Sequence, residues 1–219
     1  MKSIPSPSKS RRSTIFRQKA NIFRPARANT YSVAFLRPLP KLRGQESRGL
    51  FVVGNHSFQC AIGRSGIGRK MREGDGVTPL GRYHVLFWLH RPDEWRGSRP
   101  GAKKLSKLDG WCDETGASLY NRPVKLPVPF SSEKLWRDDR IYDLIGVIDY
   151  NWRPRVQGRG SAIFIHIARV DLQPTEGCLA FKREELRKLQ FLLATQLQLL
   201  IGPSAIRPRS PKIAEPTRT

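Results

Sequence analysis

The residues best suited to covalent chemistry in this 219-residue chain are its three cysteines, Cys60, Cys112 and Cys178. A thiolate is a strong nucleophile when a nearby base or backbone N–H donors support it. Cys178 follows a turn over residues 174–177, in which Gly177 lets the backbone come close to a bound molecule. The N–H groups of such a turn can face a developing oxyanion. We therefore predict that Cys178 is a catalytic nucleophile and that Gly177 belongs to its site.

A candidate base lies 12 residues upstream of this cysteine. His166 stands in the run Ala162–Ile167, whose other members are all apolar, so its polar imidazole requires a reason. It can serve as a general base, or it can be a buried histidine bonded to backbone. Cys178 by itself could also be a small, buried apolar side chain with no catalytic role. Spacing alone does not choose between these readings.

The segment Asp109–Glu114 offers a weaker candidate for substrate binding. Trp111 has an apolar face that could line a groove, and the neighbouring acids could meet a substrate ammonium. The alternative is a structural loop with a buried Trp and Cys. The odd number of cysteines argues against a full disulfide framework. No His or Cys spacing matches a metal site and residues 63–68 lack the context of a phosphate loop, so we expect no metal and no organic cofactor.

Apolar runs between turn-forming residues predict the strands that position these groups. A hairpin is expected around residues 54–57. Residues 90–136 have the composition of long loops that carry short strands. Leucines at helical spacing predict one helix, Lys182–Gln196, with two glutamates in its first turn. The expected strands are Leu50–Val53, Phe58–Ile62, Tyr83–Leu89, Leu144–Ile148, Ala162–Ile167 and Leu197–Ile201.

Basic charge is concentrated toward the ends of the chain. The formal net charge is +22, of which residues 1–49 contribute +11 and residues 202–219 contribute +3. We predict a basic, disordered arm over 1–49, one catalytic domain over 50–201 and a disordered tail over 202–219. A rival from another class is a basic nucleic-acid-binding protein. The chain contains no recognition motif for DNA or RNA, so we expect no nucleic-acid partner.

The sequence does not indicate a cellular location. Its first 30 residues contain no apolar run typical of a secretory signal, and no run of 18 apolar residues predicts a transmembrane helix.

Three segments together resemble the L,D-transpeptidase catalytic-domain family, also called YkuD-like, over roughly residues 50–201. Lys70–Tyr83 contains a Thr-Pro-x-Gly-x-Tyr pattern, Ser161–His166 resembles the strand that presents a catalytic histidine, and Thr175–Leu179 is similar to the motif around the nucleophile. Their order and spacing make the resemblance fairly specific.

Two positions depart from the family pattern. Glu176 stands where the family commonly has His, and Ala180 stands where it commonly has Arg. The missing positive charge could come from Arg169. We take Thr175, Glu176, Arg169 and Trp111 as candidate substrate-binding residues. The departures bear on specificity more than on the reaction class.

The resemblance implies a mainly β domain of mixed sheets packed as a sandwich, with one principal helix. It implies an enzyme that acts on peptidoglycan tetrapeptide stems through a cysteine thioester, with His166 as base. The acceptor would be the amine of another stem, an envelope protein, or water in a carboxypeptidase reaction. The periplasm or cell envelope is the implied location, and we expect a monomer.

Overall fold

The computed structural model describes residues 33–40, 47–193 and 197–202. Of the arm (1–49) and the tail (202–219) that we predicted to be disordered, residues 1–32, 41–46 and 203–219 lie outside these ranges. The elements in chain order are β1 (Val33–Pro38), β2 (Arg48–Val53), β3 (His56–Ala61), β4 (Ile67–Gly68), β5 (Thr78–Pro79), β6 (Gly81–His90), β7 (Lys103–Lys104), β8 (Asp109–Cys112), β9 (Arg122–Lys125), β10 (Ser132–Lys134), β11 (Leu144–Ile148), β12 (Phe164–Ile167), a 3-10 turn (Val170–Leu172), β13 (Leu179–Phe181), α1 (Arg183–Leu192) and β14 (Gln198–Ile201).

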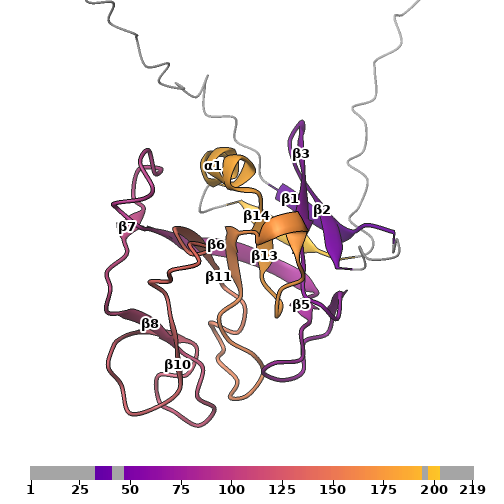
Figure 1. Ribbon diagram of the computed structural model, residues 1–219. Helices are drawn as coiled ribbons and strands as arrows, with labels where there is room; N and C mark the ends of the chain where they lie inside the picture. The colour runs from indigo at the N-terminus through magenta and orange to yellow at the C-terminus, as the bar shows by residue number, and fades with distance from the viewer. Residues whose placement is uncertain (1–32, 41–46, 194–196, 203–219) are drawn as a thin grey trace, which may run out of the picture.

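One large sheet forms the body of the domain (Figure 1). Its strand order is β11-β12-β13-β3-β2-β1-β14-β6-β7, and an additional pairing of β11 with β6 closes the sheet on itself. Most pairs are antiparallel, but β12–β13, β1–β14 and β6–β7 are parallel. The predicted mainly β class, with mixed sheets and one helix, is confirmed. The two faces expected of a sandwich come from one continuous sheet that folds back on itself.

The β2–β3 hairpin illustrates how the sequence produces these strands. Buried and partly exposed residues alternate along β2, as expected for a strand with one face on a core. The turn places Gly54 at a φ of 55°, a conformation that favours glycine. The six predicted strands are all present, and each boundary lies within two residues of the predicted one.

The domain begins earlier in the chain than predicted. Val33–Pro38, which we assigned to a disordered arm, forms β1 between β2 and β14. Ala34 and Leu36 of this strand are fully buried in the core. The prediction failed because β1 pairs with a strand more than 160 residues away, and a local pattern does not report such a partner.

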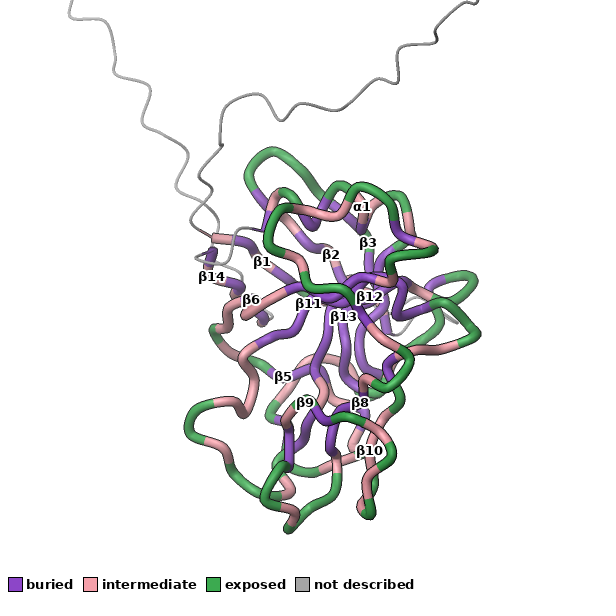
Figure 2. The backbone as a smooth tube through the Cα atoms, turned by 90° about the vertical axis from the view of Figure 1, so that its left-hand side faces the viewer, coloured by how far each residue is buried: buried purple, intermediate pink, exposed green. Residues whose placement is uncertain are grey.

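The single described helix, α1, covers one side of the sheet and contributes Leu186 and Leu189 to the main core. Figure 2 shows the buried chain concentrated in the sheet, with exposed residues on the outer face of α1. The helix was predicted to reach Gln196 but ends at Leu192. Leu193 has non-helical dihedral angles, φ −86° and ψ 82°, and its side chain is buried. Residues 194–196 lie outside the described residues.

A smaller sheet of β10, β8 and β9 lies below the large one (Figure 1). It occupies part of the stretch predicted to be long loops with short strands. A second apolar cluster, which includes Trp111, Tyr142, Phe164 and Cys178, joins the two sheets. In the described part of the chain, no helix is long and apolar enough to cross a membrane.

Candidate active site

The loop before Cys178 is closed by the hydroxyl of Thr175. Thr175 Oγ1 donates to the Cys178 carbonyl at 2.7 Å and accepts from the Gly177 N–H at 3.2 Å. Gly177 has a φ of 134°, and a Cβ at this position would lie 2.7 Å from the Val77 carbonyl oxygen. Only glycine fits this position, for both conformational and steric reasons.

The Cys178 thiol is held between backbone groups of the segment that leads into β12. Its Sγ accepts from the Phe164 N–H at 3.3 Å and donates to the Ala162 carbonyl at 3.2 Å. Burial, with a further contribution from the Glu133 carboxylate, raises the pKa of Cys178 to about 12. The resting thiol is therefore neutral at pH 7, and a base must take its proton during attack.

His166 presents a neutral imidazole. Its Nδ1 lies 2.9 Å from the Ile167 carbonyl oxygen, and because a carbonyl only accepts, Nδ1 carries the proton. That tautomer leaves Nε2 as a proton acceptor. Burial, helped by the nearby charges of Arg169 and Arg137, lowers the pKa of His166 to about 4. The ring also packs edge-on against Tyr142, with centroids 5.2 Å apart.

Two neighbouring parallel strands bring the cysteine and the histidine together. Ile165 is paired with Leu179 and His166 with Ala180, so Cys178 lies just before the paired part of β13. His166 and Phe164 are two residues apart in β12 and so share one face of the sheet. The side chains of Cys178 and His166 line the same cavity, which has a volume of about 390 Å³.

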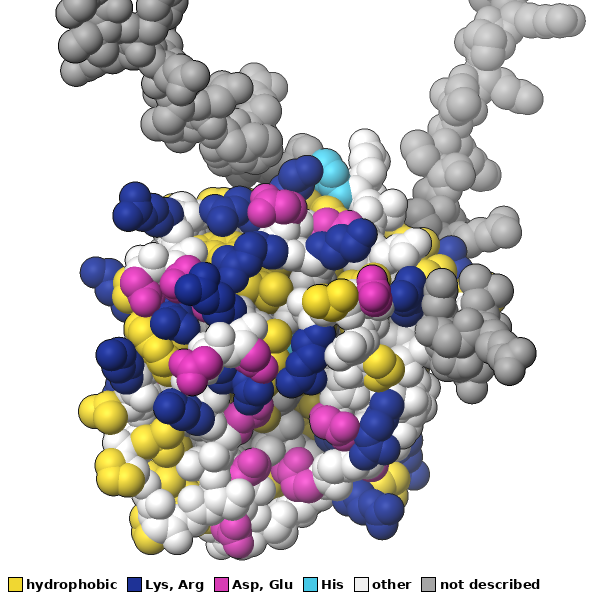
Figure 3. All heavy atoms as spheres, in the orientation of Figure 1, with side chains coloured by type: hydrophobic (Ala, Val, Ile, Leu, Met, Phe, Trp, Pro, Cys, Tyr) yellow, Lys and Arg dark blue, Asp and Glu magenta, His cyan; other side chains and the backbone are white. Residues whose placement is uncertain are grey.

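The cavity wall carries charges of both signs. Basic and acidic side chains are also intermingled on the face of the molecule in Figure 3. A wall of this kind suits a substrate with both ammonium and carboxylate groups. The charged residues of the wall are Lys70, Glu73, Asp113, Glu133, Arg137, Arg169 and Glu176.

Three of the four predicted substrate-binding residues lie in this wall. Thr175 closes the loop, and Glu176 is exposed and paired with Arg64, Nε to Oε1 at 3.0 Å. Arg169 lies 3.5 Å from the Asp139 carboxylate and is half exposed.

The fourth predicted substrate-binding residue, Trp111, lies behind the cavity rather than in its wall. The side chain is 1% exposed and packs edge-on against Phe164, with ring centroids 5.1 Å apart. Its Nε1–H donates to Asn121 Oδ1 at 2.9 Å. Trp111 therefore fits the alternative that we considered for the Asp109–Glu114 segment, a structural loop with a buried Trp. Its ring supports the strand that carries His166.

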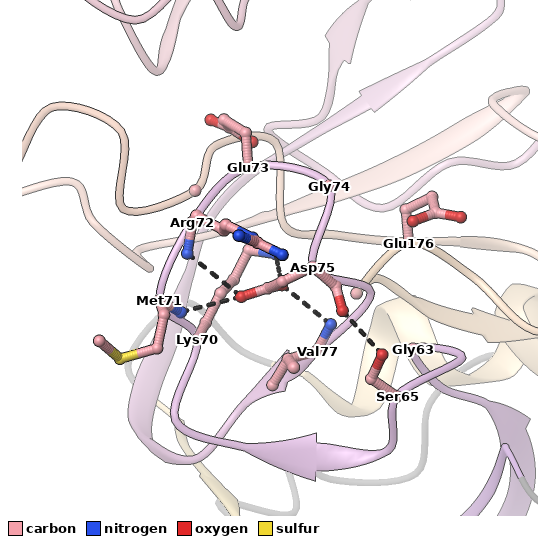
Figure 4. Close-up of polar contacts among 12 residues, drawn as sticks. Gly63, Ser65, Lys70, Met71, Arg72, Glu73, Gly74, Asp75, Val77 and Glu176 are labelled. Carbon is pink, nitrogen blue, oxygen red and sulfur yellow. Dashed lines mark hydrogen bonds and ion pairs between the residues drawn. The ribbon is translucent and has the colours of Figure 1, made fainter.

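Sequence reasoning missed the contribution of the loop between β4 and β5. Lys70 is buried against the cavity, 2.6 Å from the Asp75 carboxylate. Asp75 also accepts from the N–H groups of Met71, Arg72 and Val77, and Figure 4 shows its carboxylate turned into the loop. The sequence indicated this segment only through its likeness to the family. Its Gly-Asp-Gly turn was the local signal that could have predicted a structured loop here.

The wall also contains Tyr142 and Glu133, which the sequence did not single out. The Tyr142 hydroxyl donates to Glu133 Oε1 at 2.7 Å. Glu133 comes from the small sheet, so both sheets contribute to the cavity. Within the described residues, no three His, Cys, Asp or Glu side chains form a group that could hold a metal ion.

The fold and the site together define the class of protein. It is a mainly β domain in which one cysteine and one neutral histidine line a shared cavity. The family model YkuD, the L,D-transpeptidase catalytic domain, matches residues 45–196, and the chain belongs to this family. Members of the family are cysteine-nucleophile acyltransferases that act on peptidoglycan in the cell envelope. No significant match was found among curated proteins or among solved structures.

Proposed function

We propose that this chain is an L,D-transpeptidase whose Cys178 is acylated by the tetrapeptide stem of peptidoglycan. One observation carries the proposal: Cys178 and His166 line the same cavity, and the Nε2 of His166 is left as a proton acceptor. Membership of the family supplies the substrate class.

The first half-reaction forms a thioester. Cys178 Sγ attacks the carbonyl carbon after the third residue of the stem while its proton passes to His166 Nε2. Since burial favours the neutral forms of both groups, the proton moves as the S–C bond forms. The tetrahedral intermediate then collapses, the C–N bond breaks, and the imidazolium protonates the departing amine of D-Ala.

The second half-reaction releases the enzyme. An acceptor amine attacks the thioester, His166 takes a proton from this amine, and the imidazolium passes that proton to Cys178 Sγ as the C–S bond breaks. With an amine of another stem the product is a cross-link, and with an envelope protein it is a protein attachment. Attack by water makes the enzyme a carboxypeptidase. The reaction belongs in the periplasm or cell envelope, and a monomer suffices because one chain supplies both groups.

The charged wall supplies substrate recognition in this proposal. Arg169 offers a positive charge for a stem carboxylate, in place of the arginine that the family commonly has where this chain has Ala180. Glu133 and Asp113 offer negative charges for an ammonium group. Thr175 and Glu176 border the entrance beside the nucleophile.

The test is turnover of a disaccharide tetrapeptide by the full chain, followed by mass spectrometry of the products. Cys178→Ser should lose D-Ala release by a factor of about 1,000 or more, because an alcohol has no accessible ionised form at neutral pH. Cys112→Ser is the matched control, because Cys112 is a buried thiol outside the cavity wall. Equal turnover by Cys178→Ser and the wild type would refute the nucleophile assignment.

A further inference from the structure

Thr78 connects the loop between β4 and β5 to the nucleophile loop. Its side chain is fully buried, and Oγ1 donates to the Gly177 carbonyl at 2.9 Å. The same oxygen accepts from the Gly63 N–H at 2.8 Å. One hydroxyl therefore links the segment at Gly63 to the loop before Cys178. Thr78 and Gly177 are 99 positions apart in the sequence.

The held carbonyl belongs to the peptide unit that ends in the Cys178 N–H. In a trans peptide the C=O and N–H bonds point in opposite directions. Fixing the Gly177 carbonyl toward the buried Thr78 therefore turns the Cys178 N–H away from Thr78. The other N–H of this turn, that of Gly177, is already bonded to Thr175 Oγ1.

We propose that Thr78 is a positioning residue that sets the Gly177–Cys178 peptide so that the Cys178 N–H faces the developing oxyanion in the cavity. This inference rests on the acyl transfer proposed above. The peptide has little freedom to turn otherwise, because Thr78 and Thr175 hold both ends of the turn and Gly177 lies against the Val77 carbonyl. An N–H that faces the oxyanion lowers the barrier to attack at a carbonyl.

Two reactions of the same thiol separate this role from a general structural one. In acylation by 4-nitrophenyl acetate, Sγ attacks a carbonyl, an oxyanion forms and collapses, and 4-nitrophenolate leaves. In alkylation by iodoacetamide, Sγ displaces iodide at a saturated carbon and no oxyanion forms. Only acylation needs the Cys178 N–H, whereas both reactions need an accessible sulfur whose proton is removed during attack.

The experiment measures both second-order rate constants at Cys178 in the full chain, with the background of Cys178→Ser subtracted. Thr78→Val keeps the shape and removes the hydroxyl, and we expect its acylation rate to fall about tenfold or more. Its alkylation rate should stay within about twofold of the wild type, because the thiol environment is kept. Thr78→Ser keeps the hydroxyl and should restore most of the acylation rate.

Ser47→Ala is the matched control. Ser47 donates to the Arg64 carbonyl at 3.3 Å, so its loss loosens the segment next to Gly63 without touching the Gly177 carbonyl. This variant should leave the ratio of acylation to alkylation unchanged.

The inference is overturned if Thr78→Val lowers both rates by the same factor, if it lowers neither, or if the wild type is alkylated but not acylated. Turnover of the tetrapeptide stem is measured separately. A wild type without stem turnover whose acylation rate still depends on the Thr78 hydroxyl would refute the proposed substrate and leave the positioning role intact.

Discussion

At the scale of single residues, surroundings distinguish three thiols of similar intrinsic chemistry. Cys60 is buried in β3, where burial raises its pKa, and Cys112 is buried at the end of β8 with a raised pKa from burial and nearby acids. Cys178 also has a raised pKa, yet it lines the cavity that His166 shares. Reactivity at this position thus depends on a proton acceptor during attack rather than on a standing thiolate.

Two carboxylates in the wall oppose ionisation of Cys178, and the structure ranks them. Glu133 raises the pKa of Cys178 more than Glu176 does, since Glu176 is exposed and paired with Arg64. We predict that Glu133→Gln lowers the thiol pKa and speeds iodoacetamide alkylation at pH 7 several-fold, because it removes the charge and keeps an oxygen for the Tyr142 hydroxyl. The pH dependence of the alkylation rate measures this shift.

Glu176→Gln is the internal comparison for this titration. This variant should also lower the thiol pKa, because it removes a negative charge beside the nucleophile. Its effect should be smaller than that of Glu133→Gln because solvent and Arg64 already screen the charge. A larger shift in Glu176→Gln would mean that the ion pair opens and that the carboxylate turns toward the thiol.

At the scale of elements, the loop between β4 and β5 depends on one carboxylate. Burial alone would raise the pKa of Asp75, but the Lys70 ammonium and the backbone N–H groups of Val77, Met71 and Arg72 lower it to about 2. The same loop, drawn in Figure 4, contains Lys70, which lines the cavity.

The depressed pKa of Asp75 predicts a pH-dependent contribution to stability. A carboxyl with a folded pKa of about 2 and an ordinary value of 3.8 stabilises the fold fully above about pH 4. That contribution is lost as the pH falls through 2. We expect Asp75→Asn to lower the free energy of unfolding by about 1–2 kcal/mol at pH 7, with a difference from the wild type that shrinks between pH 4 and pH 2.

Urea denaturation at a series of pH values measures this difference, and Asp138→Asn, at an exposed carboxylate, is the control. A difference between Asp75→Asn and the wild type that stays constant from pH 7 to pH 2 would show that the charge of Asp75 does not stabilise the loop.

At the scale of the whole molecule, β1 and β14 come from opposite ends of the described chain and pair with each other in the closed sheet. β1 lies between β2 and β14, and β14 pairs in turn with β6. A deletion of residues 1–45, which would be harmless if the whole predicted arm were disordered, would remove β1 and break the sheet at this point. We therefore expect the domain to need residues that we had assigned to a disordered arm.

A single substitution in β1 tests this dependence. Leu36 is fully buried and lies against Gly49, so we expect Leu36→Ala to cost about 2–5 kcal/mol of stability. Arg37→Ala, at the neighbouring exposed position of the same strand, should change stability by less than about 0.5 kcal/mol. Denaturant unfolding curves compare the two variants. Equal stabilities would mean that β1 is dispensable.

The sequence by itself determined the elements whose signals are local. The hairpin at Gly54, the buried strand Leu144–Ile148 and the start of the helix near Lys182 follow from residue alternation, turn chemistry and helical spacing over a few neighbours. It also predicted the pair of residues, Cys178 and His166, that the folded chain brings to one cavity, because their motifs are short and contiguous.

Only the tertiary structure decided the features that depend on distant partners. The pairing of β1 with β14, the placement of Trp111 behind the cavity and the bond from Thr78 to Gly177 join residues that are far apart in the chain. The depressed pKa of His166 likewise arises from burial, which is a property of the packed domain. Packing and hydrogen bonding across the sheet set these features, and no local window of sequence contains both partners.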